Sequence, residues 1–289
     1  MKAPRFSYVR PQSLDHVVAL LAEHGDDARI LAGGQSLMPV LNMRLAQPRL
    51  LIDINRIDAL NGISLTGGCV RIGALARHAE VMSSPVIAQS LPLIAEAMPH
   101  VAHVAVRNRG TFGGSIALAD PSAELPACIL ALEASIVVES VRGRRTIPAA
   151  DFFRGLYETA RSADELLIEV RIPEQRRDRV SVFMELSRRQ GDFAIAGVAC
   201  YARCERGGMS EARLVYFGSE VKPTLARRAM AAVNGNAWSP AVSEAACSAL
   251  ADDLDPIDNT FGRPATKLHL QRVLTRRALA AAMERARVQ

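Results

Sequence analysis

Residues 107–126 have the sequence Arg-Asn-Arg-Gly-Thr-Phe-Gly-Gly-Ser-Ile-Ala-Leu-Ala-Asp-Pro-Ser-Ala-Glu-Leu-Pro, with three glycines inside five positions. Gly110, Gly113 and Gly114 alternate with the hydroxyl residues Thr111 and Ser115. Glycine lets the backbone adopt a positive φ and lets a ligand approach the main chain closely. Consecutive N–H groups and hydroxyls in such a turn form a concave site for phosphate oxygens. The stretch therefore predicts an anion-binding loop.

The end of this stretch predicts the start of a helix. Asp120 is a typical N-cap residue, Pro121 suits the first helical position, and an apolar run follows to about Leu132. We therefore expect a helix over 120–132, with the glycine loop directly ahead of it. A glycine loop directly ahead of the start of a helix suits the binding of an anion.

A second glycine pair has the same chemistry. Residues 32–37 have the sequence Ala-Gly-Gly-Gln-Ser-Leu, between a strand-like segment at 29–31 and a helix expected over 37–45, which Ser36 can cap. Two strand–glycine–helix elements suggest two contacts to one long ligand that contains a diphosphate. A lone glycine pair is more typical of a structural turn, and that alternative stays open. Neither pair matches the G-x-G-x-x-G dinucleotide fingerprint, and the chain has no G-x-x-x-x-G-K-[ST] loop.

Composition argues against several classes of protein. The 289 residues are 49% hydrophobic and 22% charged, as in ordinary folded domains. No apolar run reaches the ~20 residues that span a bilayer, and residues 1–11 lack the apolar core of a secretory signal, so we expect a cytoplasmic protein. The five cysteines lack metal-site spacing, and we expect no metal site. The net charge is +5, but aromatic residues are only 4%, so protein partners are favoured over nucleic acid.

The two glycine loops together resemble the flavin-binding motifs of a known family. Residues 32–37 are similar to an A-G-G-x-S-L loop, and residues 107–126 to an R-N-R-G-T-[IF]-G-G-[NS] loop followed by D-P-[AS]-[AS]-[DE]-L-P. Both belong to the FAD-binding medium subunits of molybdenum hydroxylases, above all of aerobic carbon monoxide dehydrogenase. The resemblance extends from Phe6 to the last expected helix. It implies FAD as the cofactor, whereas the residues alone indicate only a nucleotide-like diphosphate.

The resemblance also implies which residues contact FAD. Backbone N–H groups and hydroxyls would hold the pyrophosphate at Gly33, Gly34, Gln35, Ser36, Thr111, Gly113, Gly114 and Ser115, and the two motifs are completed by Ala32, Leu37, Phe112 and Asp120. Glu124 would bind the ribose or adenine end, although an ordinary charge in a first helical turn is an equal alternative. No nucleophile or acid–base pair stands out, so we expect no catalytic residue; the cofactor carries the redox chemistry.

Residues 188–194, Arg-Arg-Gln-Gly-Asp-Phe-Ala, resemble the family's [KR]-x-G-D-[YF]-A segment, in which an aromatic residue covers one face of the flavin ring. Phe193 would be that residue; the alternative is a place in the core of a sheet. His100 precedes a strand-like segment at 101–106, and His103 lies within it; we expect both in a loop or strand, and His103 is a candidate to line the flavin site. Asp53 ends an apolar strand and is a better candidate for holding a turn or an arginine than for catalysis.

The expected fold is α+β. The resemblance implies a two-part FAD-binding domain of the vanillyl-alcohol-oxidase type at 1–175, with a small α/β subdomain at 1–55 and a larger α+β subdomain at 56–175. A C-terminal domain of the carbon monoxide dehydrogenase flavoprotein type would follow at 176–289. There we expect three antiparallel strands, at 180–186, 193–204 and 213–217, and helices at 224–233, 240–254 and 266–287. In the FAD domain, single helices are expected at 77–82 and 85–98.

The implied function is that of the FAD-containing medium subunit of a heterotrimeric molybdenum hydroxylase. A large subunit with the molybdenum cofactor would oxidise the substrate, and a small subunit with two [2Fe–2S] clusters would send electrons through FAD to an external acceptor. A dimer of heterotrimers is expected, and peripheral membrane contact through the complex stays open. Two other classes also stay open: a stand-alone flavin oxidase of the vanillyl-alcohol-oxidase type, and a binding module that has lost its flavin.

Overall fold

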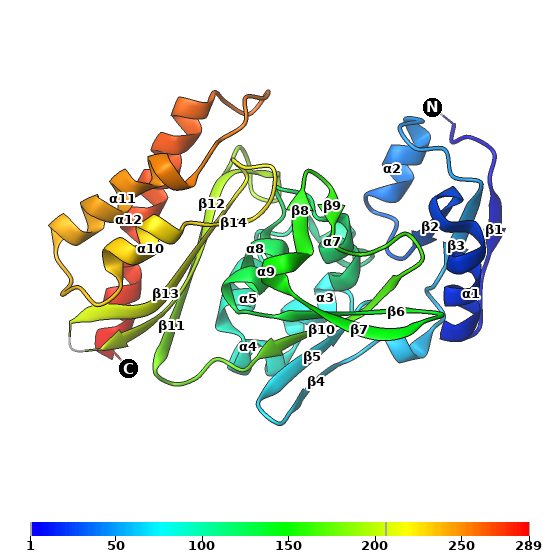
Figure 1. Cartoon of the computed structure of the whole chain (residues 1–289), viewed down its shortest axis with the longest axis horizontal. Coiled ribbons are helices and arrows are strands. Elements are labelled where there is room, and N and C mark those ends of the chain that lie inside the picture. Colours follow the sequence, from blue (N-terminus) through cyan, green and yellow to red (C-terminus); the bar gives the residue numbers. More distant parts are fainter. Residues whose placement is uncertain (1, 206, 289) are drawn as a thin grey trace.

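Three β-sheets succeed one another along the long axis of the protein, with helices between and around them (Figure 1). The computed structural model describes residues 2–205 and 207–288. Within these residues, no helix has both the length and the apolar character needed to cross a membrane. The arrangement is the α+β fold expected from the sequence.

The first sheet is small and parallel, in the order β1-β3-β2. Its elements are β1 (Ser7–Val9), α1 (Leu14–His24), a 3₁₀ turn (Gly25–Asp27), β2 (Ala28–Leu31), α2 (Leu37–Asn42) and β3 (Leu50–Asp53). Helix α1 begins where the Ser13 side chain accepts a hydrogen bond from the His16 N–H, and it buries Val17 and Leu21. These residues share a core with Val137 and Ile168 of the second sheet. The small sheet is therefore packed against its neighbour.

The second sheet is antiparallel, in the order β4-β5-β10-β6-β7. A 3₁₀ turn (Asp58–Leu60) precedes it, and its strands are β4 (Ile63–Thr66), β5 (Cys69–Gly73), β6 (Ser135–Ser140), β7 (Gly143–Pro148) and β10 (Leu166–Pro173). Between β5 and β6 lie α3 (His78–Ser83), α4 (Pro85–Ser90), α5 (Pro92–Ala97), α6 (Val104–Arg107), α7 (Phe112–Leu118) and α8 (Glu124–Ala131). After β7 come α9 (Ala149–Phe152) and the short pair β8 (Phe153–Gly155) and β9 (Glu158–Thr159).

Two expectations for the helical layer are wrong. The single helix expected at 85–98 is divided into α4 and α5 at Leu91, because Pro92 has no N–H with which to continue the helical ladder. The strand-like segment at 101–106 contains α6, for which His103 is the N-cap residue. Its valines have strand propensity, but the N–H groups of Arg107 and Asn108 donate to the carbonyls of His103 and Val104 and close a helical turn.

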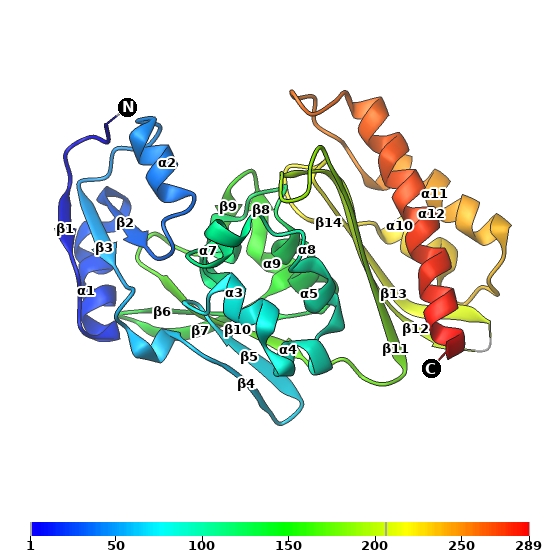
Figure 2. The same cartoon turned by 180° about the vertical axis from the view of Figure 1, so that it is seen from behind.

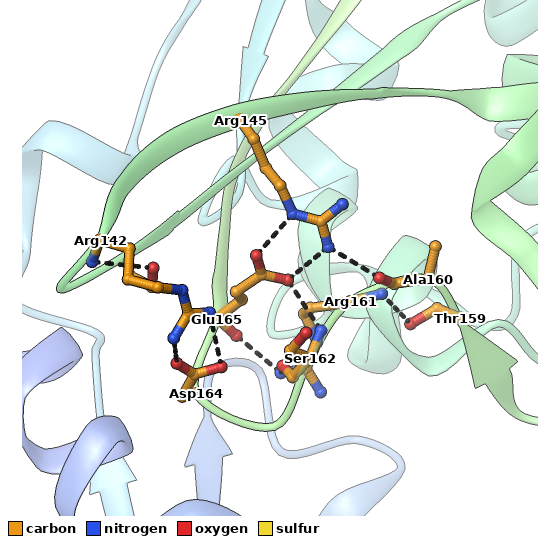
Figure 3. Close-up of polar contacts among 9 residues, drawn as sticks. Arg142, Arg145, Thr159, Ala160, Arg161, Ser162, Asp164 and Glu165 are labelled. Carbon is orange, nitrogen blue, oxygen red and sulfur yellow. Dashed lines mark hydrogen bonds and ion pairs between the residues drawn. The ribbon is translucent and has the colours of Figure 1, made fainter.

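Ion pairs fasten β7 to the segment that leads into β10 (Figure 3). Arg145 donates from Nε and Nη2 to the two carboxylate oxygens of Glu165 (2.6 and 2.7 Å), and Arg142 pairs with Asp164. Arg161 folds back and donates to the carbonyl of Glu165 (2.6 Å). Bidentate pairs of this kind combine charge with a defined geometry. They hold the chain as it passes from the β8–β9 pair to the centre of the sheet.

The third sheet is antiparallel and has four strands, one more than expected. These are β11 (Arg179–Ser187), β12 (Ala194–Glu205), β13 (Gly208–Phe217) and the added edge strand β14 (Thr224–Leu225). The helices are α10 (Arg227–Val233), α11 (Pro240–Asp253) and α12 (Pro264–Val288), close to the expected bounds. Strand β14 has only two residues, and the expectation that they start a helix over 224–233 is wrong; both pair with β13, and α10 begins at Arg227.

Both faces of the third sheet are covered. Val182, Val198 and Leu214 point to a core made with α10, α11 and α12, which lie on the outer side of the sheet (Figure 2). Their neighbours Phe183, Ala199 and Val215 point the other way, into a core made with α5 and α8. This follows from the alternation of side chains along a strand. The sheet is thus a shared wall between the helices of the two halves of the chain.

Candidate functional site

The first glycine loop, residues 32–37, connects β2 to α2. Gly34 has a φ of +73°, a conformation that glycine adopts without strain. Within the described chain, the N–H groups of Gly33, Gly34, Gln35 and Ser36 donate no hydrogen bond. Helix α2 ends at Asn42, earlier than expected, and the Ser36 side chain does not cap it. The loop therefore presents several free amide donors.

The second glycine loop, residues 107–115, differs from the expectation. Thr111 is itself an N-cap, with Oγ1 accepting from the Gly114 N–H (3.1 Å), and α7 begins at Phe112. Gly113 and Gly114 lie inside a helix, although glycine disfavours helices. The cause is tertiary: a Cβ on Gly113 would lie 2.6 Å from Ala74 Cα.

Most amides of this loop are occupied within the protein. The N–H groups of Phe112 and Gly113 donate to the carbonyls of Ala76 and Ala74, each at 2.9 Å. Phe112 is fully buried in the core, so its ring does not face a ligand. Gly114 is exposed but its N–H is bonded to Thr111 Oγ1, and Thr111 is buried, so the hydroxyl of the half-buried Ser115 is the donor that this loop offers.

The two glycine loops touch each other. A Cβ on Gly33 would lie 2.4 Å from the carbonyl oxygen of Arg109 and 2.8 Å from Gly110 Cα, so only glycine fits. A cavity of about 430 Å³ opens beside the contact, lined by the first loop from Leu31 to Gln35, by α2 and by Asp53, Asn55 and Arg109. Loops separated by some 75 residues thus border one site.

Asp53 lies at the floor of this site and holds the local backbone. Its Oδ1 accepts from the N–H of Asn55 (2.9 Å), and its Oδ2 accepts from the Tyr8 hydroxyl and from Arg10 Nε (3.1 Å). Burial opposes the charge of Asp53, but these hydrogen bonds outweigh it and keep the pKa of the carboxyl below its ordinary value. The expectation that Asp53 holds a turn and an arginine is confirmed.

The segment after α7 is a turn, not the expected start of a helix. Ser122 N–H donates to Asp120 Oδ1 (2.9 Å), and Ala123 N–H donates to the Asp120 carbonyl (3.0 Å). Helix α8 begins only at Glu124, because the aspartate caps the turn instead. Glu124 is 7% exposed, and burial raises the pKa of its carboxyl to about 7. Its position is therefore more enclosed than an ordinary first-turn charge.

The loop between β11 and β12 brings His103 and Phe193 to the same region. Gly191 has a φ of +84°, and a Cβ there would lie 2.7 Å from the His103 ring. Phe193 is 58% exposed, which excludes the alternative of a sheet core. Arg188 ties the loop to the C-terminal helices through the carbonyl of Thr260 (2.7 Å). The Phe193 ring is thus exposed at the end of a loop that contacts His103 on one side and Thr260 on the other.

Sequence reasoning missed Asn55, Arg77 and Tyr157. Asn55 and Arg77 belong to no recognisable motif, and their role follows only from contacts between loops distant in the chain. Tyr157 has a φ of +56° and donates to Asp120 Oδ2 (3.2 Å). Its one signal was the short turn between Phe153 and Thr159, where an exposed aromatic follows Gly155.

This arrangement fits a ligand with a diphosphate. Free amides in the first loop supply donors on one side, and the half-buried Ser115 hydroxyl of the second loop supplies one on the other. The glycines keep the backbones close enough for both loops to reach one group. Among residues 2–205 and 207–288, no cluster of three or more His, Cys, Asp or Glu side chains could hold a metal.

Comparison with known families decides which ligand this is. Residues 4–175 match the model of the FAD binding domain in molybdopterin dehydrogenase, and residues 181–282 match that of the CO dehydrogenase flavoprotein C-terminal domain. The chain belongs to this family of FAD-binding medium subunits. FAD is therefore its cofactor.

Relatives of this medium subunit match over nearly their whole length. The chain is 40% identical to the 6-hydroxypseudooxynicotine dehydrogenase complex subunit alpha of Paenarthrobacter nicotinovorans, covering 99% of this chain and 97% of the relative. It is 39% identical to the carbon monoxide dehydrogenase medium chain of Hydrogenophaga pseudoflava, covering 99% of both. The crystal structure of carbon monoxide dehydrogenase from that organism contains a chain that superposes with a TM-score of 0.96 over 99% of each. The oxidoreductase family and the fold are thereby shown.

Proposed function

We propose that this flavoprotein is the electron-transfer subunit of a molybdenum hydroxylase complex. Its partners would be a large subunit with the molybdenum cofactor and a small iron–sulfur subunit, in a dimer of heterotrimers, and an external acceptor would receive the electrons. The observation that carries the proposal is the direct contact of the two glycine loops beside a cavity with free amide donors. Bound FAD supplies the redox chemistry.

The residues of this chain bind and orient the cofactor. Gly33, Gly34, Gln35 and Ser36 would donate amide hydrogens to the pyrophosphate. Thr111, Gly114 and Ser115 would lie on its other side, where the Ser115 hydroxyl would donate. Ala32, Leu37, Phe112, Gly113 and Asp120 would shape the two loops without donating to the ligand. Glu124 would lie at the ribose or adenine end, and Phe193 would cover one face of the ring, with His103 beside it. The exposure of Phe193 supports that role.

The division of the chain is part of the same proposal. We place the FAD-binding domain at 1–175, with parts 1–55 and 56–175, and the C-terminal domain at 176–289, because β10 ends at Pro173 and β11 begins at Arg179. A cytoplasmic location is proposed as well, since all five cysteines are free thiols. Relatives named as a subunit or medium chain are covered almost completely, which favours a subunit over a stand-alone oxidase.

The test is to purify the full chain, record its visible spectrum and identify the cofactor released by heat. We expect the absorption of an oxidised flavin and the release of FAD; colourless protein should bind added FAD in a titration. In Gly33→Ala the new Cβ would separate the two loops, so FAD affinity should fall at least tenfold, about 1.4 kcal/mol.

A matched control is Gly68→Ala in the β4–β5 turn. Unlike Gly33, Gly68 has a positive φ (+72°), and a Cβ there meets no atom within 4 Å. This variant should lose some stability and keep its FAD affinity. Failure of the wild-type chain to bind FAD would overturn the proposed function, and equal affinity in Gly33→Ala would move the site elsewhere.

A further inference from the structure

Asn55, which follows β3, is hydrogen-bonded to the first glycine loop. Its Nδ2 donates to the carbonyls of Ala32 (2.9 Å) and Leu31 (3.3 Å), and also to Asp53 Oδ1 (2.7 Å). In a trans peptide, the C=O of one residue and the N–H of the next point in opposite directions. By holding these two carbonyls, Asn55 turns the N–H groups of Ala32 and Gly33 away from itself. The side chain therefore sets which way the first amides of the loop point.

Arg77 extends this contact to the second glycine loop. One guanidinium nitrogen, Nη2, donates to Asn55 Oδ1 (2.6 Å), and the other, Nη1, donates to the carbonyl of Arg109. That same Arg109 carbonyl is the atom against which Gly33 packs. Arg77 also pairs with Thr111 in an isolated β-bridge, directly before α7. Arg77 and Asn55 together thus join both loops near the point where they touch.

The orientation of the Asn55 amide is determined from both sides. Its nitrogen faces the Asp53 carboxylate, which can only accept, and its oxygen faces the Arg77 guanidinium, which can only donate. Asp53 in turn accepts hydrogen bonds from Tyr8 on β1 and from Arg10, the residue after β1. The chain Asp53–Asn55–Arg77 therefore has a single favourable arrangement, which is a property of a preorganised site.

We propose that Asn55 and Arg77 are positioning residues for FAD, a polar clamp that fixes the two glycine loops relative to each other. The inference rests on the proposed function, because it assumes that both loops contact the same pyrophosphate. The clamp acts on the cofactor through the peptide groups that it orients. Its loss should therefore weaken FAD binding more than it weakens the folded chain.

The test compares FAD affinity with the stability of the FAD-free chain. Asn55→Asp keeps the size of the side chain but removes its donors and sets a second carboxylate against Asp53. Arg77→Met removes both donated hydrogen bonds. In each full-length variant we expect the Kd for FAD, measured by quenching of flavin fluorescence, to rise tenfold or more. In the double variant the loss of FAD binding free energy should be smaller than the sum of the losses in the two single variants, because the residues act as one unit.

Matched controls separate positioning from general destabilisation. Asn236→Asp removes one amide-to-carbonyl bond after α10 (3.0 Å), and Arg142→Met removes an exposed bidentate pair with Asp164. These variants should lower the melting temperature of the FAD-free chain and leave the Kd unchanged. If the wild type binds FAD and both clamp variants bind it with the affinity of the wild type, the role of Asn55 and Arg77 is overturned, but the proposed function stands. A wild type that binds no FAD overturns the proposed function with it.

Discussion

Glu185 is a carboxylic acid on the face of the third sheet that packs against α5 and α8. Its side chain is 1% exposed, and His100 Nδ1 lies 4.0 Å from Oε2. Burial, together with the charge of Glu124, raises the pKa of Glu185 to about 8, against an ordinary value of 4.5. A carboxyl in such a place is protonated in the folded chain at neutral pH. It therefore couples the stability of the protein to pH.

The sign of this coupling gives a prediction for Glu185→Gln. In the unfolded chain the carboxyl ionises near its ordinary pKa, whereas the folded chain holds the proton up to about pH 8. The free energy of unfolding should therefore fall as pH rises from near the ordinary pKa of 4.5 to about 8. Glutamine removes this penalty, so the variant should melt roughly 3 °C or more above the wild type at about pH 8, with a smaller gain at about pH 5.

Thermal unfolding at the two pH values checks this prediction. Glu244→Gln serves as the control, because Glu244 is exposed and forms a surface pair with Arg276; its effect on the melting temperature should be small. An equal shift for Glu185→Gln at both pH values would contradict the buried, protonated state.

At the scale of single elements, the last carbonyls of helix α8 accept hydrogen bonds from a side chain of the third sheet. The last carbonyls of a helix have no partner within it, and Arg213 on β13 donates to those of Leu130 and Ala131, each at 3.0 Å. Its third nitrogen pairs with Glu133 (3.1 Å). This is one of the polar links between the FAD-binding half and the third sheet.

Arg213→Met should therefore cost about 1.5–3 kcal/mol of unfolding free energy, the range for hydrogen bonds to a charged group. Arg276→Met removes an arginine from an exposed pair with Glu244 and should cost only about 0–1 kcal/mol. Urea denaturation of the two variants makes the comparison. Equal losses would show that the α8 carbonyls are satisfied by water in the absence of Arg213.

At the scale of the whole molecule, the second and third sheets share one core. Phe183, Val215 and Phe217 of the third sheet belong to the same buried cluster as residues of α5 and α8. Arg285 on α12 reaches Glu96 on α5, which also accepts from the Phe183 N–H (3.1 Å). Neither half of the chain therefore buries its apolar face alone.

We accordingly expect the chain to unfold as one cooperative unit. Calorimetry of the FAD-free protein should give a single transition with equal calorimetric and van't Hoff enthalpies. Residues 176–289 expressed separately would expose Phe183, Val215 and Phe217 and should show no cooperative transition. Two separate transitions in the intact chain would contradict the shared core.

The sequence by itself determined the cofactor motifs, the α+β class and most strands and helices. Gly33, Gly34, Gly113 and Gly114 are recognisable because they recur in two short motifs of neighbouring residues, although contacts with distant backbone are what require glycine at Gly33 and Gly113. The long strands β11, β12 and β13 follow from their own residue pattern. These features depend on neighbours in the chain, which a sequence displays directly.

Tertiary structure alone decided the remaining features. Thr111 starts a helix because Ala74 and Ala76 accept the next two amides, a contact with residues some 35 positions away. The Asn55–Arg77 clamp and the exposure of Phe193 likewise depend on contacts between distant segments. Hydrogen bonds and close packing across the fold outweigh local propensities of a few tenths of a kcal/mol per residue. For that reason the motifs could be found in the sequence, whereas the way they are held together required the folded chain.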